Sequence, residues 1–280
     1  MEPLEYCRQK VAAEGSNLYY LLLFQAPENR PGLLALYSLE AELLEVLEGC
    51  SELHVAQHKL SFWVEELQRM LTDTPRHPVS QALRIHLNDR KILSKELCTQ
   101  LLQGFTHRLQ EPTLDTREQL QLQCHETAGV LGLAVSQWLD PDNPESAKAL
   151  QTLATAIEIQ RRLRFRVIAG QPLHTTVPGE ELTRFSLANE QFVLGADEPQ
   201  LLPLKLHLLE STRQSIHDAQ QMIRPSPAAG LALAQARIAL GESAKSKPWL
   251  KSGLTTQGLP SISPLRKFWI AWRSATAMRE

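Results

Sequence analysis

Apolar residues at helical spacing recur along almost the whole chain, and this pattern constrains the fold more than any other feature. In residues 30–50, RPGLLALYSLEAELLEVLEGC, apolar side chains return at intervals of three, four and seven residues, and Gly49 follows as a stop signal. The same spacing predicts further helices at residues 54–71, 80–87, 94–110, 116–139, 146–168, 202–223, 227–240 and 264–278. There is no alternating strand pattern of useful length and no repeat of fixed period, so we predict an all-α fold.

Short segments rich in proline, glycine, asparagine and aspartate separate these predicted helices. They lie at residues 26–32, 73–78, 140–146, 170–181, 223–230 and 258–264. Residues 245–264 are predicted to be the only long irregular stretch, which crosses the surface before a terminal helix. Because several helices are apolar on more than one face, we expect a single domain, residues 1–280, in which core helices are wrapped by others.

Composition and charge argue against several classes of protein. The formal net charge of -2 gives no reason to expect binding to nucleic acid. No CxxC motif or zinc-ligand spacing occurs, so reduced core thiols are expected at Cys7, Cys50, Cys98 and Cys124. The N-terminal residues lack the pattern of a signal peptide, and the longest apolar run, residues 18–24, is too short to span a bilayer. We therefore expect a cytoplasmic protein, with any contact to the inner membrane being peripheral.

One segment, residues 157–182, combines helical spacing with an unusual charge distribution. It holds four arginines within six positions, at Arg161, Arg162, Arg164 and Arg166. No acidic residue occurs from 159 to 179. A solvated basic face would place at least two of Arg161, Arg162 and Arg166 at the surface, with Arg162 on the solvent side. Alternatively, a guanidinium group here could bind a phosphate or carboxylate directly, without a metal.

Four segments, in the correct order along the chain, make it similar to a known protein family. They are GSNLYYLLLFQAPENRPGLLALYSLEAELLEVLE (15–48), HKLSFWVEELQRMLTDTPRHPVSQAL (58–83), CHETAGVLG (124–132) and PLRKFWIAWRSA (264–275). The first keeps Arg30 and the triplet ALY (35–37), and the second keeps Trp63 and HPV (77–79). The chain resembles the squalene/phytoene synthase family, whose members join two prenyl diphosphates head to head. This resemblance implies an all-α bundle of the isoprenoid-synthase type around a central cavity.

The resemblance also implies two acidic motifs that bind metal. In this family Mg²⁺ ions hold the leaving diphosphate, and aspartates at i and i+4 on facing helices hold the ions. The first motif should follow ALY by about two turns, where this chain has Leu44, Glu45 and Glu48. Leu44 thus replaces the first aspartate. The two glutamates form either a solvated face or a surviving half-site.

The second acidic motif is degenerate throughout. Family members follow the pattern A-x-Q-L-x-N-x-L-R with an aspartate, and with another aspartate four residues later. The matching segment here reads AIEIQRRLRFRVIA (156–169), which keeps Arg164 but has Phe165 and Ala169 at the two aspartate positions. A further aspartate that the family often places near mid-chain is replaced by Arg108.

The loss of these carboxylates predicts the loss of the metal. A divalent cation will not bind among four guanidinium groups, because like charges ~4–6 Å apart repel by about 1–4 kcal/mol each. We therefore expect no catalytic residue, no metal and no cofactor, with Mg²⁺ needed only if the chain is an active enzyme. The helices at 33–47 and 147–166 should nevertheless face each other across a central cleft, because both carry motif positions.

Several side chains carry more specific expectations. Arg164 should pair with Glu45 and Glu48 across the cleft, or bind an anion; Arg30 is the second candidate anion-binding residue. Ordinary polar or capping roles are expected for His54, His58, His77, His107 and His125. The terminal segment FWIAWR (268–273) is expected to dock as a core helix, with a membrane-surface helix as the alternative.

Three functions are compatible with this pattern. The first is a non-catalytic relative that acts by binding, since the family includes a branch without acidic motifs that serves as an assembly factor for a respiratory complex. The second is an active prenyltransferase of squalene, phytoene or hopanoid synthesis with an eroded metal site. The third is a carrier of a lipid or quinone. The cavity would then hold an isoprenoid or another apolar or anionic ligand, and the first function implies a protein partner.

Overall fold

The computed structural model describes residues 1–50, 52–87, 92–163, 177–187, 201–251 and 260–277. In these ranges the chain is built of helices joined by turns and contains no strand, which confirms the predicted fold class. The helices are α1 (Pro3–Val11), α2 (Asn17–Leu23), α3 (Arg30–Glu48), α4 (Leu53–Leu71), α5 (Pro78–Leu87), α6 (Lys95–Gln110), α7 (Arg117–Cys124), the π-helical segment η2 (His125–Gly129), α8 (Val130–Leu139), α9 (Pro144–Leu163), α10 (Gly179–Arg184), α12 (Leu202–Gln221), α13 (Ala229–Lys251) and α14 (Pro264–Thr276).

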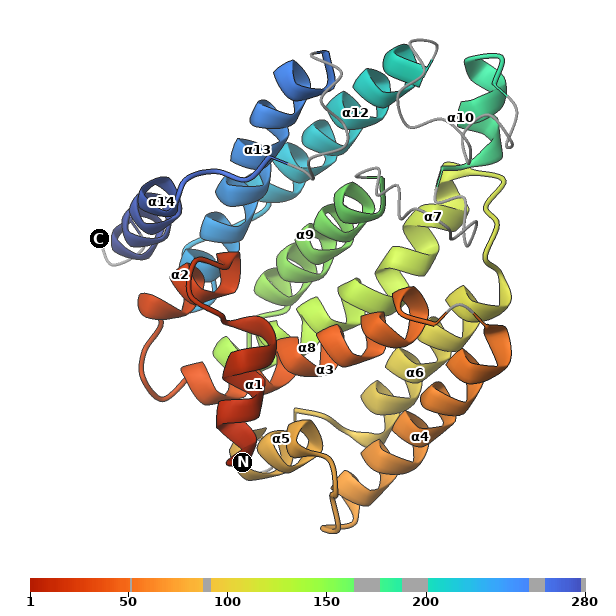
Figure 1. Cartoon of the computed structure of the whole chain (residues 1–280). Coiled ribbons are helices and arrows are strands. Elements are labelled where there is room, and N and C mark those ends of the chain that lie inside the picture. Colours follow the sequence, from red (N-terminus) through yellow and green to blue (C-terminus); the bar gives the residue numbers. More distant parts are fainter. Residues whose placement is uncertain (51, 88–91, 164–176, 188–200, 252–259, 278–280) are drawn as a thin grey trace.

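Helix α9 lies in the middle of the molecule, where it packs against α8 on one side and α12 and α13 on the other (Figure 1). Helix α3 packs against α8, and α1 and α5 cover α3 from outside. Helices α4 and α6 pack against each other at the lower right of the view in Figure 1. The two helices with the degenerate motifs, α3 and α9, are therefore inner elements, which agrees with their apolar composition.

The predicted helix at residues 116–139 is interrupted by one π-helical turn, η2, which separates α7 from α8. Close packing surrounds this region: a Cβ on Gly104 would lie 2.3 Å from the carbonyl oxygen of Glu126, and one on Gly132 would lie 2.7 Å from that of Leu150. The absence of a side chain at Gly132 thus lets α8 approach α9 closely. The π turn itself carries no signal that helical periodicity could detect, since it adds only one residue to a turn.

Helix α13 is longer than the apolar spacing predicts. It continues to Lys251 and contains Pro248, although residues 245–264 were expected to be irregular. Ser246 and Leu250 lie on the buried side of this extension, so packing outweighs the backbone hydrogen bond that a proline removes. The prediction for residues 245–251 is therefore wrong, and residues 252–259 lie outside the described part of the chain.

The cysteine and terminal-helix predictions are confirmed. Cys7, Cys50, Cys98 and Cys124 are all free and buried. Helix α14 docks on α13 and α2, and its residues Ile270, Ala271 and Ser274 are buried there. No helix in the described ranges is both long and apolar enough to cross a membrane.

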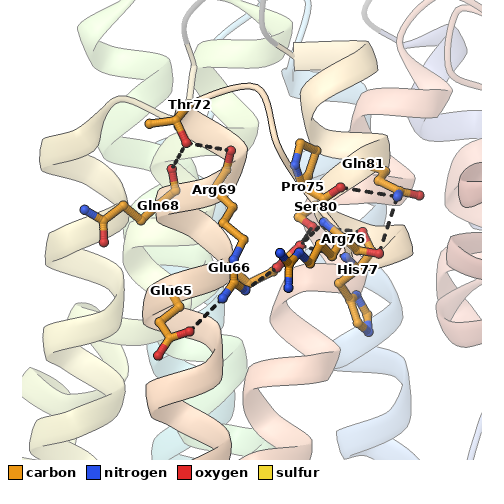
Figure 2. Close-up of polar contacts among 10 residues, drawn as sticks. All are labelled: Glu65, Glu66, Gln68, Arg69, Thr72, Pro75, Arg76, His77, Ser80 and Gln81. Atoms are coloured by element: carbon orange, nitrogen blue, oxygen red, sulfur yellow. Dashed lines mark hydrogen bonds and ion pairs between the residues drawn. The ribbon is translucent and has the colours of Figure 1, made fainter.

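A buried carboxylate fixes the corner between α4 and α5. Glu66 is fully buried on α4, and its Oε1 accepts hydrogen bonds from the backbone N–H groups of Arg76 and His77, both at 2.6 Å, and from the Ser80 hydroxyl (Figure 2). Its Oε2 accepts from Arg69 at 3.0 Å. Burial by itself raises the pKa of Glu66, but these hydrogen bonds outweigh it and hold the pKa below its usual value.

Glu66→Ala should lower the free energy of unfolding by about 3 kcal/mol, because it strands buried N–H groups at the start of α5. The folded-state pKa is depressed, so this contribution is present above the unfolded-state pKa, about 4.3, and is lost as the pH falls through the folded value. Urea unfolding of both proteins at pH 7 and at lower pH measures this. Glu65→Ala is the matched control, since the Glu65 side chain is 65% exposed and, among the described residues, pairs with Arg69 alone, so a change under about 0.5 kcal/mol is expected. Equal effects of the two substitutions would contradict the capping role.

Candidate functional site

A cavity lies between α3 and α9, which confirms that these helices face each other. It consists of two adjoining pockets of about 170 Å³ and 260 Å³ that share Tyr37, Ile157, Arg161 and Gln235 in their walls. We call them together the central cavity. Its walls are mostly apolar and come from α2, α3, η2, α8, α9 and α13. The charged side chains that line it are Glu40, Glu158, Arg161 and Glu242.

Arg161, which lines both pockets, forms the centre of an ion-pair network. Its Nε donates to Glu158 Oε2 at 2.6 Å, and its Nη2 donates to Glu158 Oε1 at 2.8 Å. The same Nη2 donates to Glu48 Oε1 at 2.6 Å, which joins α9 to the end of α3. Both carboxylates that approach this guanidinium are therefore engaged in ion pairs. We call Glu48, Arg108, Glu158 and Arg161 the ion-pair network.

Arg108 of α6 completes the ion-pair network from the other side. Its Nη1 donates to Glu158 Oε1 at 3.1 Å, and its Nη2 lies 3.5 Å from Glu48 Oε1. Glu158 is only 3% exposed, and burial alone raises its pKa, but Arg161 and Arg108 outweigh burial and lower it. Burial and the neighbouring Arg162 lower the pKa of Arg108 to about 10, so it stays protonated at neutral pH. Glu158 is thus a buried, ionised carboxylate held by two guanidinium groups.

The three residues of the first degenerate motif point in different directions. Leu44 lines the central cavity, and Glu48 belongs to the ion-pair network. Glu45 turns away from the cavity and binds Lys10 of α1, so the prediction that it faces the cleft is wrong. Leu44 and Glu48, four residues apart, share one face of α3, whereas Glu45 is turned by about 100° from Leu44 around the helix axis. The two glutamates bind different partners, Lys10 and Arg161, and do not form a shared half-site.

The second degenerate motif lies outside the described residues. This applies to Arg164, Phe165 and Ala169, and to Arg166 as well. The pairing with Glu48 that was expected of Arg164 is made by Arg161, one helical turn earlier.

The prediction that Arg162 faces solvent is wrong. It is 8% exposed, and its Nη2 donates to Gln123 Oε1 at 3.1 Å while its Nη1 lies 3.6 Å from the Cys124 sulfur. Arg161 and Arg162, the two arginines of the basic segment that are described, are thus both engaged inside the fold. Arg30 lies elsewhere: it donates to the backbone carbonyls of Gln25 and Leu23 at 2.9 and 3.0 Å and shapes the link between α2 and α3.

Sequence reasoning missed three residues of the site. Glu158 and Arg161 stand at the glutamine and asparagine positions of the pattern A-x-Q-L-x-N-x-L-R, and their i, i+3 spacing with opposite charge could have identified them as a pair. Glu40 lies between Leu36 and Leu44 at spacings of four, so a carboxylate interrupts an apolar stripe. Both signals lie outside the aspartate positions of the two acidic motifs.

The described residues do not fit a Mg²⁺ site. No group of three or more histidine, cysteine, aspartate or glutamate side chains is placed to hold a metal ion among them. Glu158 and Glu48 have carboxylate oxygens engaged by guanidinium groups, and a cation at that place would meet Arg161 and Arg108 at close range. Two of the histidines play the expected polar roles: His77 Nδ1 accepts from the backbone N–H of Val79, and His107 bridges Glu111 and Glu126.

Comparison with known proteins identifies the same family that the sequence resembles. A family model described as squalene/phytoene synthase matches residues 11–243. The 15-cis-phytoene synthase of Synechocystis sp. is 23% identical over 235 residues, which cover 80% of this chain and 69% of that protein. A dehydrosqualene synthase in complex with ligand has a TM-score of 0.81 at 17% identity, covering 99% of this chain and 96% of that chain. Squalene synthase HpnC from Alicyclobacillus acidocaldarius has a TM-score of 0.72 at 16% identity, with coverages of 89% and 94%.

Arg161→Ala should lower the free energy of unfolding by about 2 kcal/mol, because it leaves buried Glu158 with Arg108 alone. The value is below that for a fully buried pair because the Arg161 side chain is 35% exposed. Arg213→Ala is the matched control: Arg213 is 34% exposed, and its ion-pair partner within the described ranges is the exposed Glu210, so a change within about 0.5 kcal/mol is expected. Chemical denaturation of the three proteins makes the measurement, and indistinguishable midpoints would mean that the ion-pair network contributes nothing to stability.

Proposed function

Because the chain belongs to the squalene/phytoene synthase family, we propose that it is a non-catalytic member, which keeps the fold and cavity and acts by binding. The observation that carries this proposal is the ion-pair network between α3, α6 and α9. The enzymes of the family need carboxylates that are free to hold Mg²⁺ against a diphosphate. Here Glu48 and Glu158 bind Arg161 and Arg108 instead.

The electrostatics explain why such a network opposes the reaction. Loss of diphosphate from an allylic carbon needs positive charge directed at the leaving oxygens in the transition state. Arg161 could supply it only after breaking two contacts with Glu158 and one with Glu48. Freeing the guanidinium would strand a buried carboxylate, which is costly. The two guanidinium groups and two carboxylates of the ion-pair network neutralise one another, so little positive charge remains to stabilise a leaving diphosphate.

Purified protein with Mg²⁺ and farnesyl or geranylgeranyl diphosphate should form no coupled product. Chromatography of the extracted reaction checks this, with the dehydrosqualene or phytoene synthase of a relative as the positive control. Steady product formation that a chelator abolishes would overturn the proposal and establish the alternative, an active prenyltransferase. That alternative is favoured only by the names of the relatives, since both the Synechocystis protein and HpnC are called synthases.

The proposal includes a protein partner. A fold that has lost its reaction and kept its shape can serve as a scaffold, and we assign it the role of an assembly factor, with a respiratory complex as the candidate client. A deletion strain that lacks an assembled respiratory complex but has normal terpenoid content would support this role. A strain with the opposite phenotype would refute it.

We also propose peripheral attachment to the inner membrane from the cytoplasmic side, through α14. The face opposite its buried side carries Leu265, Phe268, Trp269 and Trp272, which are 81%, 45%, 49% and 48% exposed. Arg266 and Arg273 are exposed on the flank, and no acidic residue occurs in α14. Tryptophan and arginine on an amphipathic helix suit an anionic lipid surface. Docking on the domain and contact with a membrane use opposite faces of this helix, so the two are compatible.

Trp269→Ala/Trp272→Ala should weaken binding to anionic phosphatidylglycerol vesicles by about tenfold or more, because two half-exposed indoles no longer enter the interface. Vesicle co-sedimentation measures the change. Phe62→Ala is the control, since Phe62 is 42% exposed on α4, away from α14. If the wild-type chain stays in the supernatant, or the variant binds equally well, this attachment is excluded.

A further inference from the structure

Two carboxyl groups of the central cavity take no part in the ion-pair network, Glu40 and Glu242, and Glu242 accepts hydrogen bonds from Asn17 and Ser261. Glu40 lies on α3 between Leu36 and Leu44, and all three line the cavity. It has no hydrogen-bond or ion-pair partner among the described residues, although charged Glu158 and Arg161 are close enough to influence it. An unpaired carboxyl in an apolar wall is unfavourable for the fold, which makes it a candidate for contact with a ligand.

The charges around Glu40 argue against an anionic ligand. The lining of the pocket that contains Glu40 holds two carboxylates, Glu40 and Glu158, and one guanidinium, Arg161. That guanidinium already makes three short contacts with carboxylate oxygens. A diphosphate placed here would meet uncompensated negative charge in a poorly solvated space, where like charges repel strongly.

The same wall suits a different polar group. Burial and the nearby Glu158 raise the pKa of Glu40 to about 7, so the carboxyl can donate a hydrogen bond as well as accept one near neutral pH. Tyr37 and Gln235, which bind each other at 2.5 Å, add neutral polar atoms to the same pocket. Leucine, isoleucine, valine and alanine side chains form most of the remaining wall.

We infer that the central cavity binds an uncharged isoprenoid or long-chain lipid with a hydroxyl head group, which hydrogen-bonds to the carboxyl of Glu40. This inference rests on the proposed function, because it assumes that the cavity binds a ligand and does no chemistry. It goes further in assigning the ligand class: an alcohol in place of the diphosphate that the family's enzymes ionise. Glu40 is then a specificity-determining residue, since it attracts a hydroxyl and repels a phosphate.

Titration calorimetry of the full chain with farnesol and with farnesyl diphosphate, each with and without Mg²⁺, tests the inference. The two probes share one prenyl chain and differ only in the head group. Farnesol should bind at least about tenfold more tightly than the diphosphate. Glu40→Leu should weaken farnesol binding by about tenfold, the equivalent of one hydrogen bond in a buried site, and Glu40→Gln should retain most of it.

The stability of the variants separates a ligand-binding role from a structural one. Glu40→Leu should leave the melting temperature of the free protein unchanged or raise it, because leucine continues the apolar stripe of α3. A residue that merely supports the fold would show the opposite. Glu45→Gln, five residues further along α3 but directed at Lys10, is the control and should alter neither farnesol binding nor the head-group preference.

The outcomes distinguish this inference from the proposed function. Binding of the diphosphate as tightly as farnesol, without turnover, overturns the hydroxyl-ligand inference and leaves the non-catalytic proposal standing. Unchanged farnesol binding by Glu40→Leu also overturns it. Mg²⁺-dependent conversion of the diphosphate overturns the proposed function. If neither probe binds, the hydroxyl-ligand inference is overturned, and so is the part of the proposed function that assigns a ligand to the cavity.

Discussion

The interior of this protein is organised around one buried negative charge. Glu158, on the central helix α9, is almost inaccessible to water, and an ionised carboxylate in that position must be neutralised and hydrogen-bonded. Arg161 on the same helix and Arg108 on α6 supply the opposite charge, and Glu48 at the end of α3 completes the set. The relative positions of three helices therefore depend on a single electrostatic requirement.

This requirement also determines the chemical character of the central cavity. Because the guanidinium groups are used to neutralise Glu158 and Glu48, they have few donors left for a ligand. In the pocket that contains Glu40, the remaining wall is apolar except for Glu40 itself and the Tyr37–Gln235 pair. A metal-dependent enzyme needs the reverse arrangement, in which carboxylates are open and bind cations. Under the proposed function, the fold of the family is kept while the reaction is lost.

Part of the site was accessible from sequence, and the reason is local geometry. Opposite charges three residues apart on one helix meet on one face, so Glu158 and Arg161 could be paired by spacing alone. The same rule places Glu48 on the face of Leu44 and turns Glu45 away from it, yet it does not say which of the two faces inward. That choice depends on α1, whose Lys10 holds Glu45, and on α9, whose Arg161 holds Glu48. Long-range partners of this kind have no signature in the local sequence.

The sequence by itself determined the all-α class, the approximate helix positions, the family and the absence of the expected aspartates from their motif positions. These properties follow from the 3.6-residue period and from residue identity, both of which are readable along one chain. Only the tertiary structure decided that Arg162 is buried, that Arg108 reaches Glu158 across 50 positions, that α13 continues past Pro248, and that Glu40 lines the cavity without an ion-pair partner among the described residues. Burial and charge pairing depend on which helices pack together, and that is set by the complementarity of whole faces, so no single segment contains the information.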